Sequence, residues 1–226
     1  MERIGALLID FGGTLDADGL PWADRFFALY HGAGGEIDRS RFNAAFAAAD
    51  RLLARLPGVV TFDYSATATA QARLLRGLLP DGAETLTDAA ALRFARDARQ
   101  CAARNAPVLR DLKRTWRLGV VSNFQGNLAP CLAELGLDDV FDAVSDSAVV
   151  GAEKPDRRIF EATTAALGLS AAACWMVGDS PPNDIAAATA LGMRTCWVAP
   201  ATRPVIGPVP TRRIARFDEL PLALAA

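Results

Sequence analysis

Short apolar runs that end in polar residues recur along the chain and alternate with segments of helical periodicity. The apolar runs predict strands at Ile4–Asp10, Arg117–Ser122, Ala143–Ser145, Cys174–Asp179 and Thr195–Val198. Helices are predicted between them, at Leu128–Leu135, Arg158–Leu167 and Asp184–Leu191, each followed by a glycine typical of a helix C-terminus. Strands that alternate with helices predict a parallel sheet covered on both faces. A short strand near Ile214 and a helical turn at Asp218–Leu222 complete the pattern.

The segment 16–105, between the first and second predicted strands, breaks this alternation. Its periodicity predicts helices at Trp22–His31, Arg39–Leu56, Tyr64–Leu79 and Thr87–Arg104, with Pro80-Asp81-Gly82 as the last break between them. A connection from a strand to a helix normally needs only a few residues, so this segment is predicted to be an inserted helical domain. We therefore predict an α/β fold with a core of residues 1–15 and 106–226, and an insert at 16–105 that covers the site.

Composition narrows the classes of partner. The chain has 226 residues, of which 51% are hydrophobic, and this is ample for a buried core. A formal net charge of −2 gives no global electropositivity, so we expect neither a nucleic acid nor a membrane as partner. The four cysteines form no CxxC pair, and the N-terminal apolar run is too short to span a bilayer. We expect a soluble cytoplasmic protein, and the sequence leaves its oligomeric state open.

Polar residues end the predicted strands, where parallel sheets place their ligand sites. Four motifs stand at these strand ends or in nearby loops: Asp10-Phe11-Gly12-Gly13-Thr14-Leu15, Val120-Val121-Ser122-Asn123, Gly151-Ala152-Glu153-Lys154-Pro155-Asp156 and Gly178-Asp179-Ser180-Pro181-Pro182-Asn183-Asp184. Taken singly, each has an ordinary structural explanation, such as a strand end, a helix cap or a turn. Their joint occurrence indicates one chemical site.

The aspartates of these motifs suit a phosphoryl transfer. Asp10 follows a strand and precedes a glycine-rich turn, so its carboxylate can meet a phosphate and form an acyl phosphate. Two anions do not approach each other unaided, and a divalent cation removes that obstacle. Asp10, Asp179 and Asp184 offer the oxygen ligands that Mg²⁺ prefers.

The other motif residues are candidates for binding the phosphate. Ser122 and the amide of Asn123 are expected just before a helix, where free N–H groups favour an anion. Lys154, one of only two lysines, would offset charge on the nucleophile and the transferring group. Gly12 and Gly13 are expected to let the backbone take an unusual turn and approach the ligand closely.

The four motifs, in this order, resemble those of the haloacid dehalogenase-like superfamily along nearly the whole chain. The resemblance implies a Rossmann-like core with a helical cap of the C1 type, and hydrolysis of a small phosphorylated metabolite through an aspartyl phosphate on Asp10. It also implies a Mg²⁺ ion bound directly by Asp10 and Asp179, by the carbonyl of Gly12, and by Asp184 through water. Ser122 and Lys154 would then assist catalysis.

The chain departs from this family at Gly12. Phosphatases of the family carry a second aspartate there, which protonates the leaving group and then activates the hydrolytic water. General acid–base catalysis typically contributes about 100- to 10,000-fold, so its loss matters. Either Asp16, Asp18 or Glu153 supplies the proton, or the substrate has a good leaving group such as an acyl or aryl phosphate. The third interpretation is a protein that binds a phosphorylated ligand or a partner without turnover.

Two other chemistries of the family are weaker alternatives. Phosphonate-cleaving members also lack the second aspartate, but they need a cap lysine for a Schiff base. No lysine lies between Leu15 and Lys113, and this disfavours that reaction. Dehalogenating members need no metal, whereas the aspartates of this chain favour one.

Overall fold

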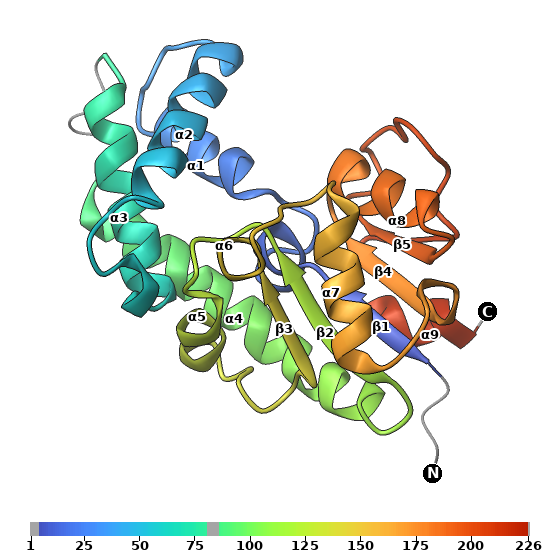
Figure 1. The fold of residues 1–226 in the computed structure, drawn as a ribbon. Coiled ribbons are helices and arrows are strands. Elements are labelled where there is room, and N and C mark those ends of the chain that lie inside the picture. The colour runs from blue at the N-terminus through green and yellow to red at the C-terminus, as the bar shows by residue number, and fades with distance from the viewer. Residues whose placement is uncertain (1–4, 81–85, 226) are drawn as a thin grey trace.

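The computed structural model describes residues 5–80 and 86–225, which fold around a six-stranded parallel sheet (Figure 1). The strands are β1 (Ala6–Ile9), β2 (Arg117–Ser122), β3 (Ala143–Asp146), β4 (Cys174–Gly178), β5 (Arg194–Val198) and β6 (Arg212–Ile214). Their spatial order is β3-β2-β1-β4-β5-β6, and every neighbouring pair is parallel. The predicted α/β fold class is confirmed. The predicted positions Ile4 and Asp81-Gly82 lie outside the described residues.

The first strand lies in the middle of the sheet and is buried on both faces. Leu7 and Ile9 belong to one hydrophobic cluster, whereas Ala6 and Leu8 belong to another. This double burial explains why β1 is continuously apolar, without the alternation of a half-exposed strand. Because β1 pairs with β2 on one side and β4 on the other, its carboxyl end at Asp10 opens at the centre of the sheet edge.

The helices form two groups. The insert contributes α1 (Trp22–Gly32), α2 (Arg39–Leu53), α3 (Tyr64–Leu78) and α4 (Asp88–Leu112); the core contributes α5 (Leu128–Glu134), α6 (Ser147–Val150), α7 (Arg157–Leu167), α8 (Ala187–Ala190) and α9 (Leu220–Ala225). Residues of α4 share the cluster of Leu7 and Ile9, and residues of α7 share the cluster of Ala6 and Leu8. Helices therefore cover both faces. Over the described ranges, none of them combines the length and apolarity needed to cross a bilayer.

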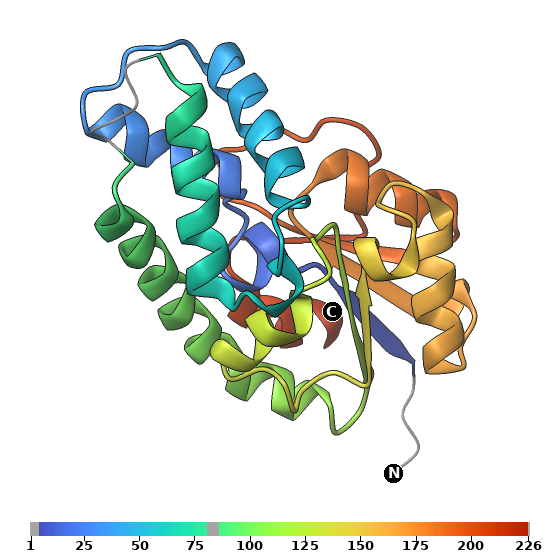
Figure 2. The ribbon, with the colours of Figure 1, turned by 60° about the vertical axis from the view of Figure 1, so that its left-hand side comes forward.

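The inserted helices stack beside the carboxyl edge of the sheet (Figures 1 and 2). The last of these helices is longer than predicted: α4 continues through Pro107 to Leu112 instead of ending at Arg104. A proline inside a helix removes one hydrogen bond and costs about 3 kcal/mol. Here the buried stripe continues past it at Leu109 and Leu112, and this packing holds the helix together. The predicted boundary between residues 105 and 106 falls inside this helix.

Asp146, at the end of β3, fixes the loop that follows β2. Its carboxylate accepts hydrogen bonds from the backbone N–H groups of Gly126, Leu128 and Ala148 at 2.9–3.1 Å. It thereby caps the first turns of both α5 and α6, although only 4% of its surface is exposed. The loop between β2 and α5 is thus held by one buried side chain.

We expect Asp146→Ala to lower the free energy of unfolding by about 2 kcal/mol or more, because several buried N–H groups lose a charged acceptor. Urea denaturation measures this loss. Glu161→Ala is the control: Glu161 pairs with Arg157 on the surface of α7, and such pairs contribute less than about 1 kcal/mol. Equal effects of the two substitutions would contradict the capping role of Asp146.

Candidate active site

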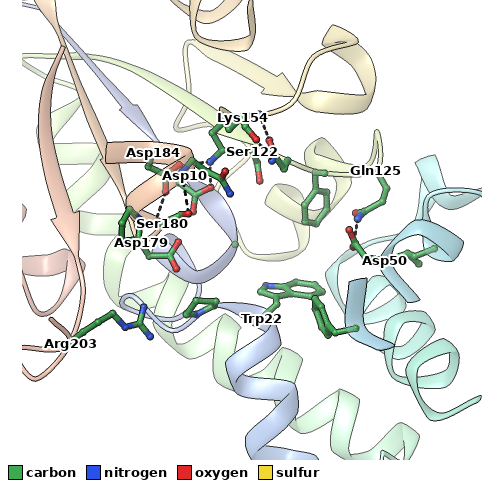
Figure 3. Close-up of a pocket in the computed structure, with 18 residues that line it drawn as sticks. Asp10, Trp22, Asp50, Ser122, Gln125, Lys154, Asp179, Ser180, Asp184 and Arg203 are labelled. Carbon is green, nitrogen blue, oxygen red and sulfur yellow. Dashed lines mark hydrogen bonds and ion pairs between the residues drawn. The ribbon is translucent and has the colours of Figure 1, made fainter. Parts of the chain in front are cut away.

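Acidic and basic side chains from three separate motifs meet in one cavity of about 340 Å³ (Figure 3). Asp10 follows β1, Asp179 follows β4, Asp184 lies in the next helical turn, and Lys154 comes from the loop between α6 and α7. The Lys154 Nζ lies 2.6 Å from Asp10 Oδ1 and 2.7 Å from Asp184 Oδ1. All four side chains are buried.

Thr14 orients the carboxylate of Asp10. Its hydroxyl donates to Asp10 Oδ2 at 2.8 Å and also lies 3.3 Å from Asp179 Oδ1. Asp10 is therefore held from two sides, by Lys154 on one oxygen and by Thr14 on the other. The sequence reasoning assigned no role to Thr14, although its position one helical turn after Asp10 is compatible with this contact.

The turn after Asp10 needs a glycine at residue 13 but not at residue 12. Gly13 has φ of +95°, and a Cβ there would lie 2.8 Å from Asp179 Oδ2. Gly12 has φ of −76° and ψ of 116°, which any residue adopts. Its nearest neighbour beyond the turn is Trp22, whose Nε1 would lie 3.4 Å from a Cβ. The expectation that both glycines serve an unusual turn was wrong for Gly12.

Two further contacts fix the loop after β4. The backbone N–H of Ser180 donates to Asp184 Oδ2 at 2.9 Å, and the indole N–H of Trp197 donates to the carbonyl of Asp179 at 2.9 Å. A Cβ on Gly178 would lie 2.3 Å from Asp184 Oδ2, so this glycine makes room for the carboxylate. The spacing of the fourth motif thus folds Asp184 back beneath the strand that carries Asp179.

The charges in the cavity are not balanced. Burial and the neighbouring charges of Asp10 and Asp184 raise the pKa of Asp179 well above its usual value. Burial likewise raises the pKa of Asp184 to about 6, although Lys154 opposes the shift. Burial alone would lower the pKa of the Lys154 ammonium, but Asp10 and Asp184 raise it above its ordinary value. Three carboxylates thus share one ammonium group.

This arrangement fits a divalent cation. One oxygen from each of Asp10, Asp179 and Asp184 lies within 4.8 Å of the other two. Oxygen ligands of this kind suit Mg²⁺, which is commonly held by one or two carboxylates together with water and a substrate phosphate. Burial and the negative charge of the neighbouring carboxylates raise the pKa values of Asp179 and Asp184. A cation with two charges would offset that negative charge.

Ser122 and Asn123 line the same cavity, and the helix that follows them starts at Leu128, as predicted. The first N–H group of α5, that of Leu128, is donated to Asp146. Binding of a phosphate by Ser122 and the Asn123 N–H stays a prediction. The side chain of Asn123 donates to the carbonyl of Lys154 at 2.9 Å and accepts from its N–H at 2.7 Å. It holds the loop that carries the lysine.

Asp16, the first candidate for replacing the missing carboxylate, is committed elsewhere. Its side chain is buried and accepts hydrogen bonds from the Gly13 N–H at 2.6 Å, the Trp22 indole at 2.8 Å and Arg25 at 3.0 Å. The hydroxyl of Tyr64 donates to it as well. Asp16 does not line the cavity of Asp10 but a separate one of about 390 Å³.

The other two candidates also point away from the cavity. Asp18 pairs with Arg104 and accepts from the N–H of Phe217 at 3.0 Å. Glu153 is exposed and lines a different hollow beside Pro155. The hypothesis that one of these residues delivers the proton at Asp10 is therefore contradicted by their positions.

The insert provides the opposite wall of the cavity. Trp22 from α1 and Phe46, Asp50 and Leu53 from α2 line it, together with Arg203 from the loop after β5. Figure 3 shows Asp10 and Asp179 on one side of the cavity, Asp50 and Gln125 on the other, and Trp22 between the two groups. Nothing in the local pattern distinguishes Asp50 or Arg203 from the other charged residues.

Comparisons with known proteins agree with this geometry. A model of a family described as haloacid dehalogenase-like hydrolase matches residues 4–192. The mouse haloacid dehalogenase-like hydrolase domain-containing protein 3 is 41% identical over 87 residues, covering 38% of this chain and 35% of the relative. The phosphoserine phosphatase of Thermus thermophilus is 38% identical over 73 residues, covering 32% of this chain and 29% of the relative. The match to these curated relatives spans about a third of their length.

Solved structures extend the likeness to the whole fold. The HAD-hydrolase YfnB of Bacillus subtilis, bound to magnesium, has a TM-score of 0.58 at 22% identity and covers all of both chains. The 2-haloacid dehalogenase of Pseudomonas syringae pv. Tomato DC3000 has a TM-score of 0.57 at 26% identity. It covers 100% of this chain and 99% of the neighbour. The Rossmann-like α/β fold is therefore shared.

The two glycines of the turn allow a matched test. Gly13→Ala should lower the free energy of unfolding by about 2 kcal/mol or more, because the left-handed backbone alone costs about 1–2 kcal/mol and the new methyl group meets Asp179. Gly12→Ala should change it by less than about 1 kcal/mol, because its backbone is compatible with alanine. Urea denaturation of both variants checks the difference, and equal losses would refute it.

Proposed function

We propose that this chain, which belongs to the haloacid dehalogenase-like hydrolase family, is a Mg²⁺-dependent phosphohydrolase that forms an aspartyl phosphate on Asp10. The observation that carries the proposal is the convergence of Asp10, Asp179 and Asp184 around Lys154 in one buried cavity. The phosphatase named among its relatives supports the same class of reaction.

The first half-reaction uses Asp10 as the nucleophile. Asp10, Asp179 and Asp184 would hold the Mg²⁺ ion, with the carbonyl of Gly12 as a further ligand, and the ion would offset the charge of the phosphate. A carboxylate oxygen of Asp10 forms a bond to phosphorus while the bond to the leaving oxygen breaks. Lys154 pairs with Asp10 at 2.6 Å and orients its carboxylate. Ser122 and the Asn123 N–H would donate to the phosphate oxygens.

In the second half-reaction, water attacks phosphorus and the carboxylate of Asp10 is released. Lys154 stabilises the returning charge. The hydrogen bond from Thr14 keeps the released carboxylate in position for the next cycle. The side-chain contacts of Asp10 with Lys154 and Thr14 thus both have a role in the cycle.

The insert acts as a cap in this proposal. Residues 16–105 supply Trp22, Phe46 and Asp50 to a cavity whose charged end belongs to the core, residues 1–15 and 106–226. A volume of about 340 Å³ suits a small phosphorylated metabolite. The cap would select the organic part of the substrate, and the core would bind its phosphate.

Gly12 also permits a dehalogenase, and the dehalogenase fold neighbour at 26% identity is compatible with it. A halide leaves without a proton, so the reaction would need no acid at residue 12. The surplus of carboxylates over cations favours the phosphohydrolase, because a dehalogenase site needs no metal. A third function, binding a phosphorylated ligand without turnover, is motivated by Gly12 alone.

We expect Asp10→Asn to abolish phosphate release from acetyl phosphate and p-nitrophenyl phosphate in the presence of Mg²⁺, because an amide is not a nucleophile. Initial rates of phosphate release measure the effect. Asp139→Asn is the control, since Asp139 pairs with Arg110 on the surface. Unchanged turnover in the Asp10 variant would refute the nucleophile.

Metal removal separates the three functions. With EDTA, a phosphohydrolase should lose at least about 100-fold in rate and regain it with Mg²⁺, since the ion offsets several kcal/mol of charge repulsion. Chloride release from 2-chloropropionate that persists in EDTA would identify a dehalogenase instead. A protein that only binds its ligand should show binding of phosphorylated metabolites by calorimetry and no turnover of any metabolite in a broad panel.

A further inference from the structure

The ionisable side chains that line the cavity are, among the described residues, Asp10, Asp50, Lys154, Asp179, Asp184 and Arg203. Asp10 is the nucleophile of the proposed reaction, and Asp179 and Asp184 would be occupied as metal ligands. Arg203 is paired with Asp24 at 3.0 Å. Each of these four is therefore unsuited to deliver a proton to a leaving group.

Lys154 and Asp50 are no better placed. The Lys154 ammonium donates to Asp10 Oδ1 at 2.6 Å and to Asp184 Oδ1 at 2.7 Å, so its N–H groups are directed at these carboxylates. Asp50 accepts a hydrogen bond from Gln125 at 2.9 Å. Figure 3 shows this pair on the side of the cavity away from Asp10, beyond Trp22. Within residues 5–80 and 86–225, the bond that breaks beside Asp10 therefore has no general acid next to it.

An aromatic edge lies in van der Waals contact with the place where a side chain on residue 12 would begin. A Cβ there would lie 3.4 Å from Nε1 and 3.6 Å from Cδ1 of Trp22. The indole N–H is already donated to Asp16 at 2.8 Å, so it has no hydrogen left for a ligand. Next to Gly12, the cavity therefore offers an apolar surface in a fixed orientation.

Two more aromatic rings extend this surface. Phe46 and Phe124 line the same cavity as Trp22, and the ring centroids of Trp22 and Phe124 lie 6.2 Å apart at 89°. Perpendicular rings of this kind form a corner into which a planar group packs edge to face. The leaving-group side of the cavity is thus aromatic and lacks an acid.

We propose, on the basis of the phosphohydrolase function above, that the substrate is an aryl phosphate whose ring packs against Trp22. In the first step, Asp10 bonds to phosphorus, and the electron pair of the broken P–O bond leaves with the phenolate. The phenolate takes its proton from water after departure. Resonance in the ring stabilises this anion, so the absent acid is not needed. An alkoxide has no such stabilisation.

The missing group has a second consequence, because nothing beside Gly12 activates the water that hydrolyses the aspartyl phosphate. The second half-reaction is then slower than the first for a good leaving group. Accumulation of a covalent intermediate gives a burst of the first product. We expect about one phenolate per chain in the burst, and then the same kcat for every aryl phosphate.

A series of phenyl phosphates with different ring substituents, followed by glycerol 3-phosphate and acetyl phosphate, tests the inference. We expect kcat/KM to rise steeply as the leaving-group pKa falls, and glycerol 3-phosphate to react at least about 100-fold more slowly than p-nitrophenyl phosphate. Gly12→Asp should raise the rate with glycerol 3-phosphate by about 100-fold and remove the burst. Acetyl phosphate should gain much less in kcat/KM, because its leaving group needs no proton.

Trp22 variants test the packing of the ring. Trp22→Ala should raise KM for p-nitrophenyl phosphate about tenfold more than KM for acetyl phosphate, which has no ring. Trp22→Phe should restore most of the difference, and Phe46→Ala provides a second variant should Trp22→Ala not fold. Trp116→Ala is the control, because Trp116 precedes β2 at the opposite end of the sheet. An unchanged ratio of the two KM values in the Trp22 and Phe46 variants would overturn the role of the aromatic surface.

The outcomes distinguish this inference from the function on which it rests. Absence of Asp10-dependent release from every phosphate in the series would refute both. Asp10-dependent turnover of glycerol 3-phosphate at the rate of the aryl phosphates would refute the inference alone. Asp50→Asn should leave the slope against leaving-group pKa unchanged. A selective loss of alkyl phosphate turnover in that variant would identify Asp50 as the acid and overturn the inference.

Discussion

Three buried carboxylates share a single ammonium group, and the local structure around the cavity follows from that imbalance. An ionised carboxylate is costly to bury unless it is paired and hydrogen-bonded. Lys154 pairs with Asp10 and Asp184, whereas burial, together with the charges of Asp10 and Asp184, raises the pKa of Asp179. The backbone makes room for this crowding through Gly13, where a Cβ would meet Asp179. A cation bound by the three carboxylates would offset their negative charge.

Sequence reasoning located the charged residues because their positions depend on local rules. A parallel strand that ends in an aspartate places that side chain at the carboxyl edge of the sheet, and this rule was sufficient for Asp10 and Asp179. The clamp of Asn123 on Lys154 joins segments 31 residues apart, and no periodicity encodes it. The long continuation of α4 past Pro107 also escaped prediction, because tertiary packing outweighs the local preference of proline.

Asp16 illustrates why proximity in sequence is a poor guide to chemical role. It lies four residues from Gly12 and could have replaced the missing acid. Its carboxylate is instead surrounded by donors from Gly13, Trp22 and Arg25, and removing any of them would leave a buried charge less well satisfied. Asp16 thus links the catalytic turn to the first helix of the insert. The turn after Asp10 and the first helix of the insert are thus held by the same buried carboxylate.

The glycine at residue 12 and the tryptophan at residue 22 are best understood as one feature. The backbone of Gly12 would accept any side chain, so its conformation does not explain the glycine. A Cβ on residue 12 would lie 3.4 Å from Nε1 of Trp22. The hydrogen bond from this indole N–H to Asp16 fixes the orientation of the ring. A side chain at residue 12 would therefore begin in van der Waals contact with Trp22. Substitutions at these two positions should not be additive, because each changes the room available to the other.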